Sequence, residues 1–104
     1  MFDFKRKPTH PGEILKEEFL KPLGISQMRL TEDLDTTFRT VNEIINEKRG
    51  ISPEMAIKLS RYFSTSPELW LNLQNQYDLY KAKEKIGESA EHIKPYAEMH
   101  KQAV

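Results

Sequence analysis

The apolar residues of this chain fall into five short segments with helical spacing, and residues that begin or end helices bound each segment. The first segment begins at Pro11, because the first position of a helix needs no N–H to donate. It ends at Gly24, since glycine readily adopts the left-handed conformation that closes a helix. Its apolar residues share one helical face: Ile14, Leu15, Phe19, Leu20 and Leu23. This pattern predicts an amphipathic helix over residues 10–23.

Two shorter segments follow and are separated by a tight turn. Ser26 is a favourable N-cap for the first, which ends at Asp35, and Thr36 or Thr37 caps the second. The second has polar residues at most positions and apolar residues at spacings of three and four: Phe38, Val41, Ile44 and Ile45. Two short helices joined in this way are typical of a helix-turn-helix motif, here over about residues 26–46. The second helix of such a motif can enter the major groove of DNA.

The fourth and fifth segments begin with similar signals, Ser52-Pro53-Glu54 and Ser66-Pro67-Glu68. The fourth is predicted to bury four residues: Met55, Ala56, Leu59 and Phe63. The fifth is predicted to present one apolar stripe, while two leucines, Leu71 and Leu79, point elsewhere. The stripe consists of Leu69, Trp70, Leu73 and Tyr77, and we expect Trp70 to pack in the core. Apolar residues on two sides indicate either a second contact surface, such as a dimer interface, or a wide stripe that faces the core.

The chain changes character beyond Lys81, where charged and small residues dominate and a glycine and a proline interrupt the pattern. This composition indicates a frayed helical extension or a mobile tail. We therefore divide the chain into an N-terminal arm at 1–9, a domain at 10–80 and a C-terminal extension at 81–104. The predicted fold class is all-α, a five-helix domain with a short C-terminal helical extension.

The composition excludes several functional classes. The 104 residues include no cysteine, which rules out a disulfide scaffold, a thiolate nucleophile and a zinc site with sulfur ligands. His10, His92 and His100 lack the spacing of metal ligands, and no glycine-rich phosphate loop or nucleophile elbow occurs. An enzyme is the least supported class, and neither a cofactor nor a metal site is predicted. No apolar run is long enough to span a membrane and no signal peptide is seen, so we expect a cytoplasmic protein.

The outward positions of the predicted motif carry side chains suited to DNA, although basic and acidic residues are balanced at 16 each. Overall balance says nothing about how charge is distributed on the surface. Arginine can pair with guanine and asparagine with adenine. Five residues are predicted to face base edges: Thr37, Arg39, Thr40, Asn42 and Glu43. Four others are placed to hold phosphates: Gln27, Asn46, Lys48 and Arg49. The alternative is that these residues form only the solvated face of an amphipathic helix.

Three features near this surface each have a second interpretation. Phe38 either contacts a thymine methyl group or is a partly buried packing residue, and the sequence favours packing. Glu43 is expected to pair with Arg39, four residues earlier, because a carboxylate near phosphates is repelled. The basic stretch Lys5-Arg6-Lys7 either follows a phosphate backbone or is an ordinary solvated terminus.

The motif and its flanks resemble a known family. The motif resembles the helix-turn-helix of Xre-type repressors, which are related to Cro and lambda repressor. The resemblance lies in residues 26–37, Val41, Ile44 and 46–52. Two flanking stretches are similar to motifs of HigA-type antitoxins. They are His10-Pro11-Gly12-Glu13 and the stretch from Ser66 to Gln74, which reads SPELWLNLQ. The resemblance covers residues 8–80 and implies a lambda-repressor-like fold.

Two positions depart from the usual pattern of that family. Thr31 stands where the family usually has alanine, and we expect it to pack between the two helices of the motif. Asp35 stands where glycine is usual, and we expect it to adopt a positive φ, which aspartate tolerates better than most residues.

The resemblance implies a homodimeric repressor of its own operon, which binds double-stranded operator DNA. It also implies that the chain neutralises a HigB-type toxin, a ribosome-dependent messenger-RNA endonuclease. Dimerisation has a physical motive too, since one recognition helix makes few base contacts and two half-sites lie roughly 34 to 36 Å apart. Two alternatives stay open: a stand-alone Xre-type transcriptional regulator, and a helix-turn-helix protein-interaction scaffold without specific DNA binding.

Overall fold

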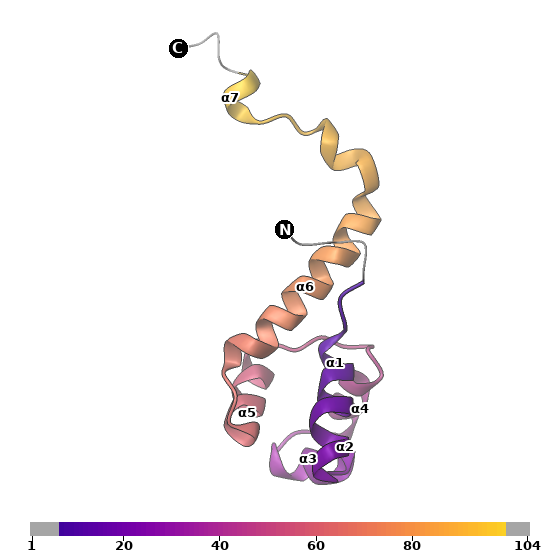
Figure 1. The fold of residues 1–104 in the computed structure, drawn as a ribbon, viewed down its shortest axis with the longest axis vertical. Coiled ribbons are helices and arrows are strands. Elements are labelled where there is room, and N and C mark those ends of the chain that lie inside the picture. Colours follow the sequence, from indigo (N-terminus) through magenta and orange to yellow (C-terminus); the bar gives the residue numbers. More distant parts are fainter. Residues whose placement is uncertain (1–6, 100–104) are drawn as a thin grey trace.

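The computed structural model describes residues 7–99, which form helices and no strand (Figure 1). The all-α prediction is therefore confirmed. The first predicted helix is one continuous helical run in three parts: α1 (Pro11–Ile14), η1 (Leu15–Leu20) and α2 (Lys21–Leu23). The following elements are α3 (Gln27–Asp33), α4 (Phe38–Ile45), α5 (Pro53–Phe63), α6 (Pro67–Ile86), the 3-10 helix η2 (Gly87–His92) and α7 (Tyr96–Met99).

The first helical run widens in the middle, because η1 has π-helical geometry and the Lys21 N–H donates to the carbonyl of Lys16. Pro22 follows directly. Its ring has no N–H to donate and clashes with the carbonyl four residues earlier in a regular α-helix, which accounts for the wider turn. Gly24 then ends the run with a φ of 67°, as predicted.

The predicted N-caps begin α3, α4, α5 and α6. Each cap hydroxyl accepts a hydrogen bond from the backbone N–H three residues later, at 3.0 or 3.1 Å: Ser26, Thr37, Ser52 and Ser66. At the third helix Thr37, not Thr36, is the cap. Because each cap satisfies a backbone donor that the helix leaves unpaired, these residues fix where the four helices begin.

The core lies between the first helical run and α3 to α6. Trp70 of α6 is fully buried, and its indole Nε1 donates to the hydroxyl of Thr65 at 2.9 Å. The ring of Phe19 packs against Phe63 and Trp70, with ring centroids 4.8 and 5.2 Å apart. The core role expected for Trp70 is confirmed. Phe63, predicted to be buried with Met55, is only partly buried.

The start of α1 docks tightly on the end of α4. The imidazole Nδ1 of His10 accepts from the Gly12 N–H at 2.8 Å and caps α1. A Cβ atom on Gly12 would lie 1.8 Å from the carbonyl oxygen of Ile44, so any side chain there would push the two helices apart. Burial lowers the pKa of His10, and the nearby Glu47 carboxylate offsets part of this shift. The lowered pKa favours the neutral ring, which can accept the hydrogen bond from Gly12.

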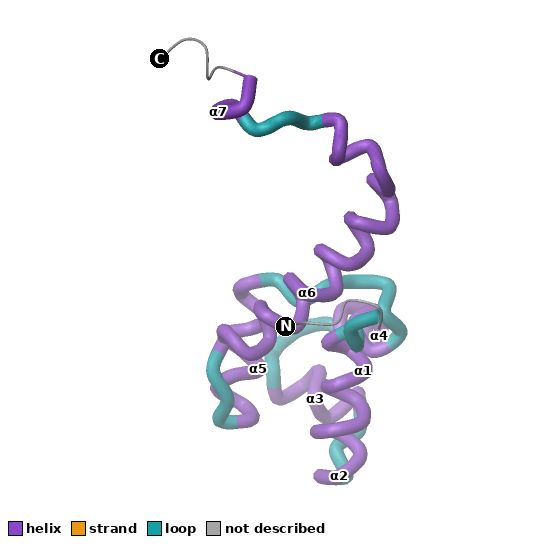
Figure 2. Tube along the Cα trace, turned by 45° about the horizontal axis from the view of Figure 1, so that its top comes forward, coloured by secondary structure: helices purple, strands orange, loops and turns teal. Residues whose placement is uncertain are grey.

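The last part of α6 leaves the helical head formed by α1 to α5, and η2 and α7 lie beyond it (Figures 1 and 2). α6 continues past Lys81 to Ile86, and Gly87 ends it with a φ of 59°. Every described residue from Lys81 onward is exposed. The extension is therefore helical over residues 81–92. Within residues 7–99, no helix combines the length and the apolar character needed to cross a membrane.

Candidate nucleic-acid interface

Helices α3 and α4 form the predicted helix-turn-helix. The turn between them contains Asp35, which has the expected positive φ of 54°, and Lys58 of α5 donates to its carbonyl oxygen at 3.2 Å. Thr31 of α3 is buried, and its hydroxyl donates to the carbonyl of Gln27 at 2.8 Å. This hydrogen bond offsets the cost of removing the hydroxyl from water, so threonine is tolerated at this position.

A polar cluster that the sequence did not reveal fixes the other end of α3. The Asp33 carboxylate accepts from the Tyr62 hydroxyl at 2.6 Å and from Arg29 Nε at 3.0 Å. These two hydrogen bonds, that from Tyr62 first, hold the pKa of Asp33 below its ordinary value. The same bond raises the pKa of Tyr62. Asp33 thus ties α3 to α5 and orients the motif on the rest of the head.

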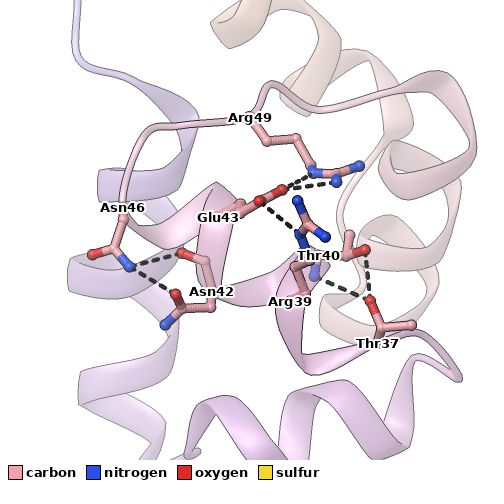
Figure 3. A network of polar contacts seen from close by, with 7 residues as sticks. All are labelled: Thr37, Arg39, Thr40, Asn42, Glu43, Asn46 and Arg49. Atoms are coloured by element: carbon pink, nitrogen blue, oxygen red, sulfur yellow. Dashed lines mark hydrogen bonds and ion pairs between the residues drawn. The ribbon is translucent and has the colours of Figure 1, made fainter.

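The outward face of α4 carries polar side chains that are hydrogen-bonded to one another in separate groups (Figure 3). At its start, the Thr37 hydroxyl lies 2.8 Å from the hydroxyl of Thr40 and accepts from the Thr40 N–H at 3.1 Å. Between these two threonines in the sequence, the side chain of Arg39 is 83% exposed. These three predicted base readers lie together at the N-terminal end of α4, which is the end that a recognition helix presents to bases.

Glu43 is held between two arginines. Its Oε2 accepts from Arg39 Nε at 3.0 Å, which confirms the predicted pair. Its Oε1 accepts from Arg49 Nε at 2.9 Å and lies 2.8 Å from Arg49 Nη2, a partner that the sequence did not indicate. The Arg49 and Arg39 hydrogen bonds, in that order, lower the pKa of Glu43. Two guanidinium groups around one carboxylate leave an excess of positive charge, which offsets the repulsion between Glu43 and a phosphate backbone.

Three amide side chains form a relay across the motif. Asn42 Nδ2 of α4 donates to Gln27 Oε1 of α3 at 3.0 Å. Asn46 Nδ2 donates to Asn42 Oδ1 at 3.1 Å and to the Asn42 carbonyl at 3.0 Å. Gln27 and Asn42, predicted separately for phosphate and base contact, are therefore in contact with each other. The relay fixes the orientation of the Asn42 amide, because Asn42 donates at one end and accepts at the other.

Phe38 is exposed, with 44% of its surface accessible. The expectation that it is a partly buried packing residue is wrong. Phe38 is the first residue of α4, next to the Thr37 cap, and it is not among the buried residues of that helix, which are Val41, Ile44 and Ile45. Phe38 is therefore an exposed aromatic residue between Thr37 and Arg39 at the start of α4.

The loop after α4 carries the predicted phosphate-holding residues. All residues from Asn46 to Gly50 are exposed, Glu47 has a φ of 61°, and the Lys48 N–H donates to the Glu43 carbonyl at 2.8 Å. Arg49 lies beside the end of α4 through its pair with Glu43 (Figure 3). The basic residues Lys5 and Arg6 and the histidine His100 lie outside the described residues. Within 7–99, no group of three or more histidines, aspartates and glutamates is arranged to hold a metal ion.

Comparisons with known proteins match this motif. The helix-turn-helix family HTH_3 matches residues 16–70. The solved structure of Pseudomonas aeruginosa antitoxin HigA with the higBA promoter is similar, at 49% identity and a TM-score of 0.82, over 86% of this chain and 98% of that chain. The chain belongs to the helix-turn-helix family of HigA antitoxins. This family is a class of DNA-binding regulators and not of enzymes.

Two further antitoxins are similar over a comparable share of the chain. Antitoxin HigA-1 of Vibrio cholerae serotype O1 is 40% identical over 91 residues, which is 88% of this chain and 86% of that protein. A structure of antitoxin GraA in complex with its operator has 40% identity and a TM-score of 0.81, over 91% of this chain and 96% of that one. The match therefore includes the helical head and most of the described C-terminal extension.

Proposed function

We propose that this HigA-family chain represses its own operon by placing α4 in the major groove of operator DNA. The observation that carries the proposal is the exposed polar face of α4, where the side chains predicted to contact bases hydrogen-bond to neighbouring side chains. The opposite face of α4 is buried. Two similar proteins, Pseudomonas aeruginosa HigA and GraA, were solved with a promoter and an operator. This arrangement supports base readout from α4 and phosphate contact from its flanks.

Each predicted site residue has a place in this proposal. Arg39, 83% exposed, is assigned to a guanine, since its guanidinium can donate two parallel hydrogen bonds. The other side chains assigned to base edges are Thr37, Phe38, Thr40, Asn42 and Glu43. The side chains assigned to phosphates are Gln27, Asn46, Lys48 and Arg49. Gln27 and Asn46 also hold Asn42, so their loss would affect base readout as well.

A homodimer is part of the proposal, because one recognition helix covers only one half-site. Exposed apolar side chains on α6 support a contact between two copies: Leu69, Leu79 and Ile86 are 37%, 60% and 47% exposed. Leu73 packs against the core as expected, and so does Leu71, for which the expectation that it points elsewhere is wrong. Both predicted interpretations of the apolar residues of α6 thus have support, one for each side of the helix.

We also propose that the chain neutralises a HigB-type toxin, because a 40%-identical relative is named Antitoxin HigA-1. We propose a cytoplasmic location as well, because a protein that binds operator DNA must be in the compartment that contains that DNA. Growth of cells that express the neighbouring small gene, with and without this chain on a second plasmid, tests the claim. Restored growth and a co-purifying complex support it, whereas a harmless neighbour leaves a stand-alone regulator.

DNA binding is tested with two duplexes, one from the region upstream of the chain's own gene and one with the same bases in scrambled order. We expect tight binding to the upstream duplex, weakening by orders of magnitude between about 50 and 200 mM salt. The scrambled duplex should bind far more weakly at each salt concentration. Equal and weak binding to both duplexes throughout would contradict repression and favour an interaction scaffold.

A further inference from the structure

We infer that Gln74 of α6 is a positioning residue for DNA binding, which acts by fixing the basic loop after α4; the inference rests on the proposed function. Gln74 Oε1 accepts from the backbone N–H of Ile51 at 2.7 Å. Ile51 is buried and follows the exposed loop that carries Lys48 and Arg49. Gln74 is 23 residues away along the chain and touches none of the predicted DNA-binding residues through this bond.

The Gln74 amide is itself held in place. Its Nε2 donates to Asp78 Oδ1, one turn further along α6, at 2.9 Å. The amide also fills the space beside Gly50, since a Cβ atom there would lie 2.8 to 2.9 Å from three of its atoms. The carbonyl end of the amide is therefore directed at the loop and its nitrogen end at Asp78.

The loop is thereby anchored at both ends. At its start the Lys48 N–H donates to the Glu43 carbonyl at 2.8 Å, and Glu43 also holds the Arg49 guanidinium. At its end the Gln74 amide receives the Ile51 N–H, which loses its partner if the glutamine is removed. Without the Gln74 bond the end of the loop is held by the packing of Ile51 alone. The backbone of Lys48 and Arg49 then takes more positions, so the two side chains meet phosphates at the same time less often.

The test measures how the affinity of the full chain for the upstream and scrambled duplexes depends on salt. Gln74→Ala should weaken binding to both duplexes by a similar factor, about three- to tenfold near 0.1 M salt. It should also lower the slope of log affinity against log salt by about one phosphate contact. The preference for the upstream duplex should not change. The matched control is Gln76→Ala, an exposed glutamine on the same helix, which should leave affinity and slope as in wild type.

Two more variants separate positioning from a general loss of structure. The double variant Gln74→Glu with Asp78→Asn exchanges the amide and the carboxylate and keeps the net charge. It retains an acceptor for the Ile51 N–H and a hydrogen bond between the two side chains. We therefore expect it to restore the slope of log affinity against log salt. Gly50→Ala, which displaces the amide from the loop side, should repeat the effect of Gln74→Ala. All assays are run well below the melting temperature of each variant.

The outcomes distinguish this inference from the proposed function. If wild type binds and Gln74→Ala binds with the same affinity and slope, the positioning role is wrong while the proposed function stands. A changed preference between duplexes with an unchanged slope also overturns it, because that result places Gln74 in base readout. If wild type shows no salt-dependent binding to either duplex, both claims fall together.

Discussion

Two exposed helical surfaces of this chain differ in how their side chains are arranged. On α4 the polar side chains hold one another: Thr37 with Thr40, Arg39 with Glu43, and Asn42 with Gln27 and Asn46. Beyond Tyr80 the end of α6 shows lysines, an ion pair between Lys81 and Glu84, and the exposed side chain of Ile86. A plain solvated face does not need such groups of mutually bonded side chains, and on our proposal those of α4 hold this surface ready for DNA in advance.

The largest expected effect is a loss of stability on substitution in the helical head, compared with the C-terminal extension. Trp70→Ala should lower the free energy of unfolding by about 3 to 5 kcal/mol, because it empties a fully buried site and leaves Thr65 without its donor. Urea unfolding followed by circular dichroism measures it. Ile93→Ala, at a residue that is 78% exposed, is the control and should change the midpoint little. Similar losses in both variants would refute the contrast between the two regions.

The next largest effect concerns DNA binding by the side chains of α4 that are assigned to base edges. Arg39→Ala should weaken binding to the upstream duplex by about 1 to 3 kcal/mol and relax the preference at one base pair in each half-site. Competition binding with single-base variants of the duplex measures both quantities. Lys85→Ala, which removes one exposed positive charge from α6, should leave the base preference intact. Unchanged affinity and preference in Arg39→Ala would remove Arg39 from base readout.

A smaller effect tests the cap of α4. Thr37→Ala should cost about 1 kcal/mol of stability, since the Thr40 N–H loses its acceptor at the start of the helix. Thermal unfolding compares it with Thr36→Ala, the neighbouring threonine that the structure does not use as a cap. An equal loss in both threonine variants would place the start of α4 elsewhere.

The smallest effect is a pH dependence at the junction of α3 and α5. The Tyr62 and Arg29 hydrogen bonds lower the pKa of Asp33, so the ionised carboxylate stabilises the folded chain. That contribution is present above the unfolded pKa of about 4 and is lost as the pH falls through the lower folded value. Melting temperatures from about pH 6 to pH 2 should fall less steeply for Asp33→Asn than for wild type. Parallel curves would show that Asp33 does not contribute.

The sequence predicted the helices well because their start and stop signals are local. A serine or threonine hydroxyl reaches an N–H only three residues away, and the left-handed residues Gly24 and Asp35 act within single turns. The pair between Glu43 and Arg39 is also local, one turn apart, and was predicted for that reason.

The missed contacts join residues that only the packed fold brings together. Gln27 and Asn42 lie 15 residues apart, and Ile51 and Gln74 lie 23 apart. No spacing rule within one helix connects such pairs. Phe38 is a similar case, because apolar periodicity does not show that the first residue of α4 stays exposed. Its position directly after the Thr37 cap is the signal that the sequence offers.

The most direct test of the account follows backbone amide signals by nuclear magnetic resonance as the upstream duplex is added to the full chain. We predict that the largest shifts occur in α4, at the start of α3 and in the loop from Asn46 to Gly50, with little change in η2 and α7. Large shifts in η2 and α7 with α4 unaffected would contradict the claim that α4 is the organised DNA-binding surface.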